Sequence, residues 1–474
     1  MLYSINMQLT LRGDYGAFNE LALRARQARD LFLIIGPPGT GKTSFGLMCC
    51  LQEELLSADA RVLLLAFTNR AVDEICAKLT AADIDFIRVG NRLTCAEAYH
   101  PYLMEEVLAM CPTADALRHR IREARVVVGT AASVAAHTGL FSLRGFSLAI
   151  IDEASQLLEP HLMGLLSMQT DGKAAIQRFI LIGDHKQLPA VVAQEEKDSA
   201  VTEKELRAIG LTDCRRSLFE RLLERYGQDP HVTYLLTRQG RMHREIAAFP
   251  NKTFYGGLLC DALERQRAPL PTSDEGNTDG LTALLRSRRI AFVASPSQTN
   301  EAAPADKVNL AEARMIAALV AKVQEMEGEA FDADHSVGII VPYRNQIATI
   351  RSALLRYNRA GLEDVTIDTV ERYQGSQRRT IIYGFTVRRE QQLDFLTGNT
   401  FTDIDGTLVD RKLNVAMTRA EEHLILMGNP KVLGCDVVFN RMIQFFRERQ
   451  CYIDVAEEDF VGGRFRLPEK KDDY

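Results

Sequence analysis

A glycine-rich segment directly after a short apolar run is the feature that most limits what this chain can fold into. The segment reads GPPGTGKT, spans Gly36 to Thr43 and follows LFLII, which has the length and composition of a buried strand. The glycines let backbone N–H groups turn inward around phosphate oxygens, and a helix starting here adds the positive end of its dipole. In this strand-to-helix setting, the pattern predicts a triphosphate-binding loop.

The loop pattern also assigns a chemical role to individual side chains. Lys42 is expected to reach the β- and γ-phosphate oxygens, and the Thr43 hydroxyl is expected to ligate magnesium. The predicted nucleotide contacts cover the loop and the residue after it: Gly36, Pro37, Pro38, Gly39, Thr40, Gly41, Lys42, Thr43 and Ser44. The chain is therefore expected to bind a nucleoside triphosphate together with Mg²⁺.

Short apolar runs followed by turns or helical spacing recur along the chain and indicate an α/β architecture. The first series consists of LFLII, VLLLAF, VVV, LAII and RFILI, and a second series starts with VTYLL at Val232. Between the series, the helical segment SLFERLLERYGQDPH is closed by Gly227 and Pro230. We predict tandem domains over 1–230 and 231–450, a short insertion near 91–125, a surface loop over 269–280 and a charged C-terminal tail over 451–474.

Composition and charge limit the class of protein further. The chain has 474 residues, 46% of them hydrophobic, and no apolar run reaches the roughly 18 residues of a membrane span. With neither such a run nor the charged start and apolar stretch of a secretion signal, we expect a cytoplasmic location and no membrane partner. Its nine cysteines form no CxxC pair, so we expect free, reduced thiols. The net charge of −6 excludes a global basic field, so any contact with nucleic acid must come from a local groove.

An acidic pair follows the apolar run in LAIIDEASQ. Asp152 ends the run and could hold the magnesium shell, while Glu153 could accept the proton of an attacking water. A DE pair after a strand is, by itself, more often a solvated turn. Together with the phosphate loop, the pair predicts hydrolysis of the bound triphosphate, with Thr43 and Asp152 as the metal ligands.

A third polar cluster and two arginines complete the candidate site. In ILIGDHKQLPAVV, Asp184 and Gln187 are expected at the same sheet edge as Asp152, with Gln187 sensing the γ-phosphate; the alternative is a capped loop. Arg241 and Arg419 lie beside strands of the second series and are candidates for neutralising transition-state charge. Taken singly, an arginine is more often a surface charge.

Ten segments in a fixed order resemble the motif series of superfamily 1 helicases, and they span about Asn19 to Asn429. The chain is most similar to the branch that contains the nonsense-mediated-decay RNA helicase and the eukaryotic replication helicase–nuclease, and IDEASQLLEPHLMGLL leans toward the second. The segments are GPPGTGKT, AFTNRAVDEI, VVVGTAAS, IDEASQ, GDHKQLPAVV, SLFERL, QGRMHREI, VPYRNQ, TVERYQGSQRRTII and LNVAMTRA.

The resemblance implies two tandem RecA-like P-loop NTPase domains, each a mostly parallel sheet with helices on both faces. It implies a monomeric ATP-dependent helicase or translocase that hydrolyses ATP to ADP and phosphate on a single strand, with DNA favoured over RNA and movement from 5′ to 3′. The implied catalytic residues are Lys42, Glu153, Gln187, Arg241 and Arg419.

Other residues carry implied binding roles. Tyr343 would stack on the adenine, with a buried tyrosine as the alternative, and Gln374 and Gly375 would couple the nucleotide to the strand-binding groove. The implied contacts to strand phosphates are Thr68, Asn69, Thr130 and Thr369. Small hydroxyl and amide groups can grip a sugar-phosphate backbone without reading bases. Thr68 and Asn69 could equally cap the helix that follows them, and both roles can hold at once.

Three features depart from the family pattern. No glutamine stands at the spacing expected for reading adenine, because Gln27 lies too close to Gly36, so selectivity for ATP stays open. Gln377 occupies a position where the family typically has a carboxylate, and it can still form hydrogen bonds. Only 18 residues precede Asn19. The chain is therefore expected to be a minimal motor or the C-terminal part of a protein with an upstream nuclease or accessory domain.

Three other functions stay open at this point. A remodeller would hydrolyse ATP on nucleic acid without productive unwinding, and a small-molecule P-loop kinase would transfer the γ-phosphate to an acceptor. A binding module would have lost hydrolysis, although Lys42, Asp152 and Glu153 are all present. The choice between DNA and RNA also stays open, because backbone contacts discriminate poorly between them.

Overall fold

The computed structural model describes residues 9–270, 278–296 and 307–469. Two compact units are present. The first comprises the described residues up to His185 together with Pro189–Thr237, and the second comprises Lys186–Leu188 together with the described residues from Arg238 onward. The predicted boundary near residue 230 thus falls inside the first unit, and a three-residue segment before it belongs to the second.

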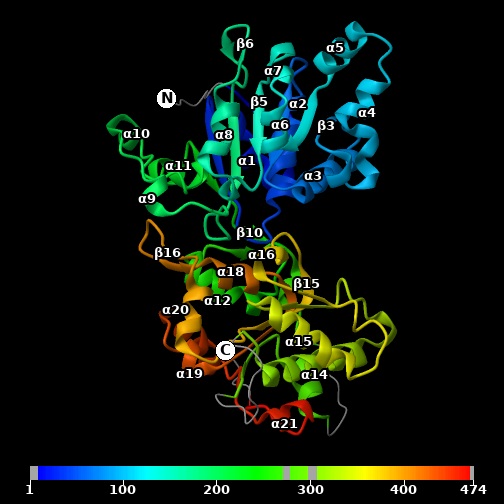
Figure 1. Cartoon of the computed structure of the whole chain (residues 1–474), viewed down its shortest axis with the longest axis vertical. Coiled ribbons are helices and arrows are strands. Elements are labelled where there is room, and N and C mark those ends of the chain that lie inside the picture. The colour runs from blue at the N-terminus through cyan, green and yellow to red at the C-terminus, as the bar shows by residue number, and fades with distance from the viewer. Residues whose placement is uncertain (1–8, 271–277, 297–306, 470–474) are drawn as a thin grey trace. The chain divides into compact units, whose positions relative to one another are not determined.

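The first unit, coloured from blue to green in Figure 1, is built on a seven-stranded sheet in the order β3-β4-β2-β5-β8-β1-β9. Every neighbouring pair in this sheet is parallel. The strands are β1 (Leu31–Ile35), β2 (Val62–Ala66), β3 (Ile87–Val89), β4 (Val126–Thr130), β5 (Leu148–Ile151), β8 (Phe179–Gly183) and β9 (Thr233–Leu235).

Helices cover both faces of this sheet because its strands are apolar on both sides. Within β1, Phe32 and Ile34 pack into one core cluster, and Leu33 between them packs into the other, as the two-residue period of a strand requires. The first face carries α1 (Asn19–Gln27), α2 (Met48–Leu55) and α3 (Asn69–Ala81). The second carries α6 (Ala131–Ala136), α7 (Gly139–Leu143), α8 (Glu159–Leu166) and α11 (Leu218–Tyr226). The predicted insertion near 91–125 contains α4 (Met104–Ala109) and α5 (Ala114–Glu123).

The second unit, coloured from green to red in Figure 1, repeats this plan with a six-stranded sheet in the order β14-β13-β15-β18-β12-β19, again parallel throughout. Its strands are β12 (Ile290–Ala294), β13 (Val337–Ile340), β14 (Thr366–Asp368), β15 (Arg378–Gly384), β18 (Ala420–Gly428) and β19 (Tyr452–Ile453). One face carries α12 (Arg244–Phe254), α18 (Arg411–Met417) and α20 (Val437–Glu448). The other carries α13 (Gly280–Ser287), α14 (Leu310–Glu327), α15 (Arg344–Leu355) and α21 (Glu457–Val461). The α/β class with parallel sheets is thereby confirmed.

Two segments join sheets against their predictions: one was assigned to the other domain, and one was assigned to no sheet. The run VTYLL, expected to open the second series, forms β9 and pairs with β1 in the first sheet. The stretch from residue 451, expected to be a charged tail, contributes β19 to the second sheet and buries Phe460 in its core. An apolar run identifies a strand, but the partner of that strand depends on long-range packing. The predicted loop over 269–280 lies largely in 271–277, outside the described residues, as does the end of the tail from 470.

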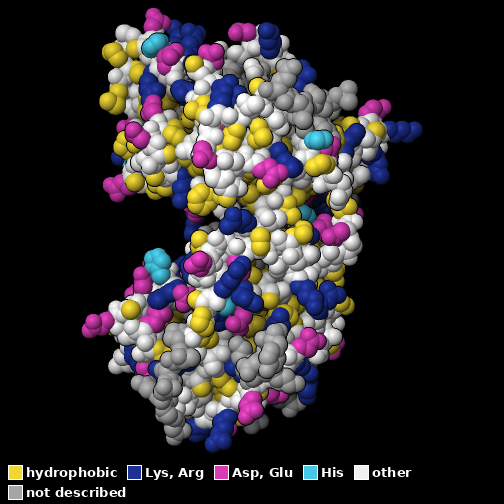
Figure 2. All heavy atoms as spheres, turned by 180° about the vertical axis from the view of Figure 1, so that it is seen from behind, with side chains coloured by type: hydrophobic (Ala, Val, Ile, Leu, Met, Phe, Trp, Pro, Cys, Tyr) yellow, Lys and Arg dark blue, Asp and Glu magenta, His cyan; other side chains and the backbone are white. Residues whose placement is uncertain are grey.

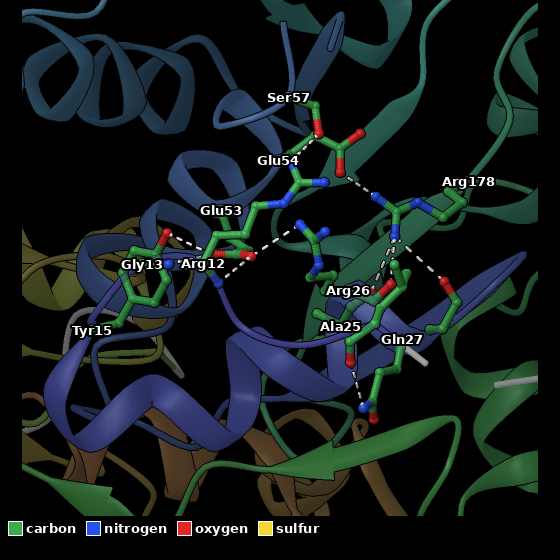
Figure 3. Close-up of polar contacts among 12 residues, drawn as sticks. Arg12, Gly13, Tyr15, Ala25, Arg26, Gln27, Glu53, Glu54, Ser57 and Arg178 are labelled. Atoms are coloured by element: carbon green, nitrogen blue, oxygen red, sulfur yellow. Dashed lines mark hydrogen bonds and ion pairs between the residues drawn. The ribbon is translucent and has the colours of Figure 1, made fainter. Parts of the chain in front are cut away.

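A buried carboxylate ties the start of the described chain to the helix that follows the phosphate loop (Figure 3). Glu53 of α2 is 2% exposed, and its oxygens accept hydrogen bonds from the backbone N–H groups of Arg12 and Gly13. They also accept from the Tyr15 hydroxyl and from Arg26 of α1, each at 3.0 Å. Such a set of donors offsets the cost of burying the charge, so Glu53 fixes α1 and residues 12–15 against α2.

We expect Glu53→Ala to lower the free energy of unfolding of the first unit by about 3–5 kcal/mol, because it leaves the buried Arg26 charge without its partner. Denaturant titration measures this loss. Glu20→Ala is the matched control, since Glu20 is 59% exposed in its ion pair with Arg24. An exposed pair of this kind contributes about 1 kcal/mol at most. Equal losses in the two variants would contradict the anchoring role of Glu53.

Candidate active site

The parallel first sheet brings the carboxyl ends of its strands to a common edge. The phosphate loop follows β1, Asp152 follows β5, and Asp184 follows β8, which lies between β1 and β5. Thr68 comes after β2, and Thr130 ends β4. Ligands of open α/β sheets bind at this edge. The fold therefore brings the candidate site residues of the first unit to one sheet edge, as the sequence predicts.

The phosphate loop depends on its glycines for two separate reasons. Gly39 and Gly41 have φ values of 75° and 73°, in the left-handed region that side chains disfavour. A Cβ atom on Gly36 would stand 2.7 Å from the Cβ of Lys42, so only glycine fits there. The Thr40 hydroxyl donates to the Pro37 carbonyl at 2.7 Å, which closes the loop before the helical segment Lys42–Leu47 begins.

The two predicted metal ligands are in direct contact. The Thr43 hydroxyl donates to a carboxylate oxygen of Asp152 at 2.6 Å. Asp152 is buried, and this burial raises the pKa of its carboxyl, against the Thr43 hydrogen bond and the charge of Lys42, which both lower the pKa. One carboxylate and one hydroxyl next to a phosphate loop are oxygen donors of the kind that Mg²⁺ uses beside substrate phosphates, so these residues fit the ion.

Glu153 is held in an unusual backbone conformation. Its φ is 52°, in the left-handed region, and its N–H donates to the Asp152 carboxylate at 2.9 Å. A left-handed conformation costs a residue with a side chain about 1–2 kcal/mol, and such strain is found preferentially at functional sites. The turn leaves the Glu153 side chain half-buried directly beside the metal-ligand candidates.

The second unit contains a cluster of four polar side chains that includes both candidate arginines. Arg419 is 2% exposed and donates to the Val415 carbonyl at 3.0 Å and to Gln187 at 3.1 Å. Arg241 donates to the Thr418 carbonyl at 3.1 Å and to Gln377 at 2.7 Å. Gln187 was expected to lie in the first domain, and the structure instead assigns it to the second unit with Arg419. The sequence assigns no site role to Gln377. It stands out there only because the family typically has a carboxylate at this position.

Tyr343, the predicted adenine contact, is packed against another aromatic ring. Tyr343 is 6% exposed, and its ring stacks on Phe395 with the ring centres 5.0 Å apart, which leaves little free face for an adenine. Tyr343 follows β13, whereas Arg419 precedes β18 in the same parallel sheet, which places the two at opposite edges. The buried-tyrosine alternative describes this residue. Gln374 and Gly375 precede β15 and therefore lie at the same edge as Arg419.

The candidate strand contacts are found at helix starts. The Thr68 hydroxyl accepts from the Ala71 N–H at 3.1 Å, and the Thr130 hydroxyl accepts from the Ser133 N–H at 3.0 Å. Both hydroxyls therefore cap a helix. In its capping bond the Thr68 hydroxyl acts only as an acceptor. Asn69 is the first residue of α3, and Thr369 precedes α16 (Val370–Tyr373) without a side-chain capping bond.

The described part of the chain holds no group of three or more His, Cys, Asp or Glu side chains that could bind a metal ion. All nine cysteines are free thiols. Within the described ranges, no helix combines the length and the apolar character that crossing a membrane requires.

Comparisons with known proteins agree with this arrangement of motifs. Two family models, each described as an AAA domain, match the chain. One matches residues 18–111 and 113–195, and the other matches residues 214–431. DNA replication ATP-dependent helicase/nuclease DNA2 of Mus musculus is 31% identical over 466 residues, covering 92% of this chain and 39% of that protein. Regulator of nonsense transcripts 1 of Dictyostelium discoideum is 25% identical, covering 90% of this chain and 31% of that protein.

Among solved structures, the arterivirus nonstructural protein 10 helicase aligns with 87% of this chain and 61% of its own, at 13% identity and a TM-score of 0.41. The chain spans about two fifths or less of the length of the two curated relatives just described. The ordered motifs, both family models and these two relatives lead to one conclusion: the chain belongs to the superfamily 1 helicases, in the branch of the replication helicase–nuclease and the nonsense-mediated-decay helicase.

Proposed function

We propose that this chain is an ATP-hydrolysing motor that moves along single-stranded nucleic acid and unwinds duplexes. The contact between Thr43 and Asp152, 2.6 Å long and adjacent to a glycine-dependent phosphate loop, is the observation that carries the proposal. Membership of the helicase family supports ATP as the triphosphate. A site of this kind needs a cation, a base for water and positive charge at the γ-phosphate, and the chain offers a residue for each.

In the proposed reaction, the backbone of residues 36–41 and Lys42 bind the phosphates, while Thr43 and Asp152 hold Mg²⁺. The ion, when bound, offsets negative charge on the phosphate oxygens. Glu153 accepts a proton from the attacking water. Gln187, Arg241 and Arg419 act on the γ-phosphate, where the arginines neutralise charge that develops in the transition state.

The strand is proposed to run over Thr68, Asn69, Thr130 and Thr369, which would contact its phosphates. The face drawn in Figure 2 carries Lys and Arg interspersed with Asp and Glu, in keeping with the net charge of −6. Attraction is therefore proposed to be local and made mainly of hydrogen bonds to the backbone. We propose DNA as the favoured substrate because a relative at 31% identity is named as a DNA replication helicase/nuclease, and 5′ to 3′ as the direction by family resemblance.

We further propose that the motor works beside additional domains and as a monomer. The mouse relative, whose name includes a nuclease, is more than twice as long as the part of it that this chain matches. No role for a nuclease is assigned to residues of this chain.

ATP hydrolysis measured with and without single-stranded DNA or RNA, at about 50 and 200 mM salt, tests this function. We expect either strand to stimulate turnover at least about tenfold, with DNA the better activator, and the stimulation to weaken as salt rises. Lys42→Ala is the control for contaminating activity, because it removes the phosphate contact from the same loop.

Strand displacement from a partial duplex, run in parallel, separates a helicase from a remodeller that hydrolyses ATP without unwinding. Hydrolysis that ignores both DNA and RNA would point to phosphoryl transfer to another acceptor. Equal activity in the wild type and Lys42→Ala would remove the phosphate loop from the reaction altogether.

A further inference from the structure

The short segment Lys186–Leu188 is held in the second unit by a buried ion pair. The Lys186 ammonium lies 2.6 Å from a carboxylate oxygen of Asp403, and the two side chains are 11% and 10% exposed. The same ammonium donates to the Phe254 carbonyl at 2.8 Å. The residues on either side, up to His185 and from Pro189, belong to the first unit. The ion pair therefore holds a three-residue segment in the second unit while the chain before and after it belongs to the first.

Further contacts fix the segment on both sides of Gln187. The Lys186 carbonyl accepts a hydrogen bond from the side chain of Asn414 in α18 at 2.7 Å. Leu188 is buried in the core cluster of the second unit that includes α12, α18 and α20. Gln187 therefore lies between a residue held by polar contacts and a residue held by apolar packing, and its side-chain amide oxygen Oε1 accepts a hydrogen bond from Arg419 at 3.1 Å.

Asp403 comes from a hairpin that directly precedes α18. The hairpin consists of β16 (Thr400–Thr402) and β17 (Leu408–Asp410), paired antiparallel, and α18 begins at Arg411. The same short stretch of chain thus supplies the acid that holds Lys186 and the helix that leads to Arg419. This arrangement links the position of Gln187 to the position of Arg419 through neighbouring residues.

We propose that Asp403 is a positioning residue for hydrolysis, acting through Lys186 to hold Gln187 against Arg419; the proposal rests on the proposed function. A catalytic group must be held to about half an ångström, and a displacement of about 1 Å costs on the order of a hundredfold in rate. Asp403 touches neither nucleotide nor water in this role. It determines where Gln187 lies when the γ-phosphate is present.

A double-mutant cycle on nucleic-acid-stimulated ATP turnover tests the proposal. Asp403→Asn keeps the shape and removes the charge, and we expect kcat to fall about tenfold while KM for ATP changes less than about twofold. Asp403→Glu restores the charge and should recover part of kcat. In a Gln187→Ala background, Asp403→Asn should have almost no further effect, because groups that act through one another are not additive. An equal loss in both backgrounds, or an unchanged kcat, overturns the proposal.

Hydrogen exchange of the peptide spanning residues 184–190 gives a readout that needs no activity. Exchange should be faster in Asp403→Asn and unchanged in Glu371→Gln, which is the matched acid-to-amide control. Glu371 is 51% exposed and forms an ion pair with Lys412 at 3.5 Å. If the wild type hydrolyses no ATP, the proposed function fails, and exchange alone decides whether Asp403 holds the segment. Unchanged exchange in Asp403→Asn overturns the claim that Asp403 holds Lys186–Leu188 in place.

If Asp403→Asn does not fold, the double variant Lys186→Met with Asp403→Leu removes the charged pair without leaving one charge buried alone. It should fold, show faster exchange in the same peptide and retain the low kcat. A folded double variant with wild-type kcat and wild-type exchange overturns the positioning role.

Discussion

Glu153→Gln is expected to bind ATP as the wild type does and to hydrolyse it at least about a hundredfold more slowly, since general-base catalysis contributes about 10²–10⁴-fold. The amide is nearly isosteric with the carboxylate and cannot accept the proton of the attacking water. The left-handed turn at φ 52° and the N–H bond to Asp152 depend on the backbone and should persist. Single-turnover hydrolysis and a fluorescent-nucleotide titration measure the two quantities separately.

Glu195→Gln is the matched control for this experiment. Glu195 lies in the first unit and is 73% exposed in its ion pair with Lys197, so the same chemical change there should leave turnover within about twofold. Wild-type hydrolysis by Glu153→Gln would assign the base to another residue. Loss of ATP binding in this variant would instead show that Glu153 shapes the nucleotide pocket.

Arg419→Ala is expected to lower kcat by about a thousandfold, because an arginine that neutralises the transferred phosphoryl group contributes about 10³–10⁵. Binding of ATP should change far less, since the ground-state phosphates keep the loop and Lys42. Arg419→Lys should recover little activity: lysine keeps the charge but lacks the planar fork that reaches Val415 and Gln187 together. Steady-state turnover and a nucleotide titration check both statements.

Arg419 is 2% exposed, so its removal also leaves a cavity, and thermal unfolding must accompany the kinetics. Arg447→Ala serves as the control, because Arg447 lies in the same unit, is exposed and stacks on Tyr452 at 4.5 Å. A folded Arg419→Ala protein that hydrolyses ATP at the wild-type rate would remove this arginine from the site. Losses of the same size in both variants would indicate a structural effect.

Much of the first unit's candidate site could be predicted because its residues follow strands directly in sequence. The phosphate loop, Asp152 and Asp184 each end a recognisable apolar run, and parallel strands bring such ends to one edge. The 2.6 Å contact between Thr43 and Asp152 joins residues far apart in sequence, yet the strand pattern already implies their proximity. Local composition was sufficient there because the chemistry sits next to the elements that position it.

The second unit was harder to predict because its cluster is assembled from side chains with no common local signal. Gln377 reaches Arg241 across the fold, and Gln187 belongs, with Lys186 and Leu188, to a unit other than that of the chain up to His185 and from Pro189. Tyr343 has a sequence context that suits a nucleotide contact, but Phe395 covers its ring. Burial of a particular face depends on the whole packed structure, which no short pattern encodes.

The sequence by itself determined the α/β class, the phosphate loop, the carboxylates at the strand ends and the family. These depend on local periodicity, on glycine conformation and on the order of motifs. Only the tertiary structure decided that β9 completes the first sheet, that β19 completes the second and that Lys186–Leu188 belongs to the second unit. The reason is physical: strand partners and buried ion pairs are selected by contacts between distant residues, whose free energy exists only once the core has formed.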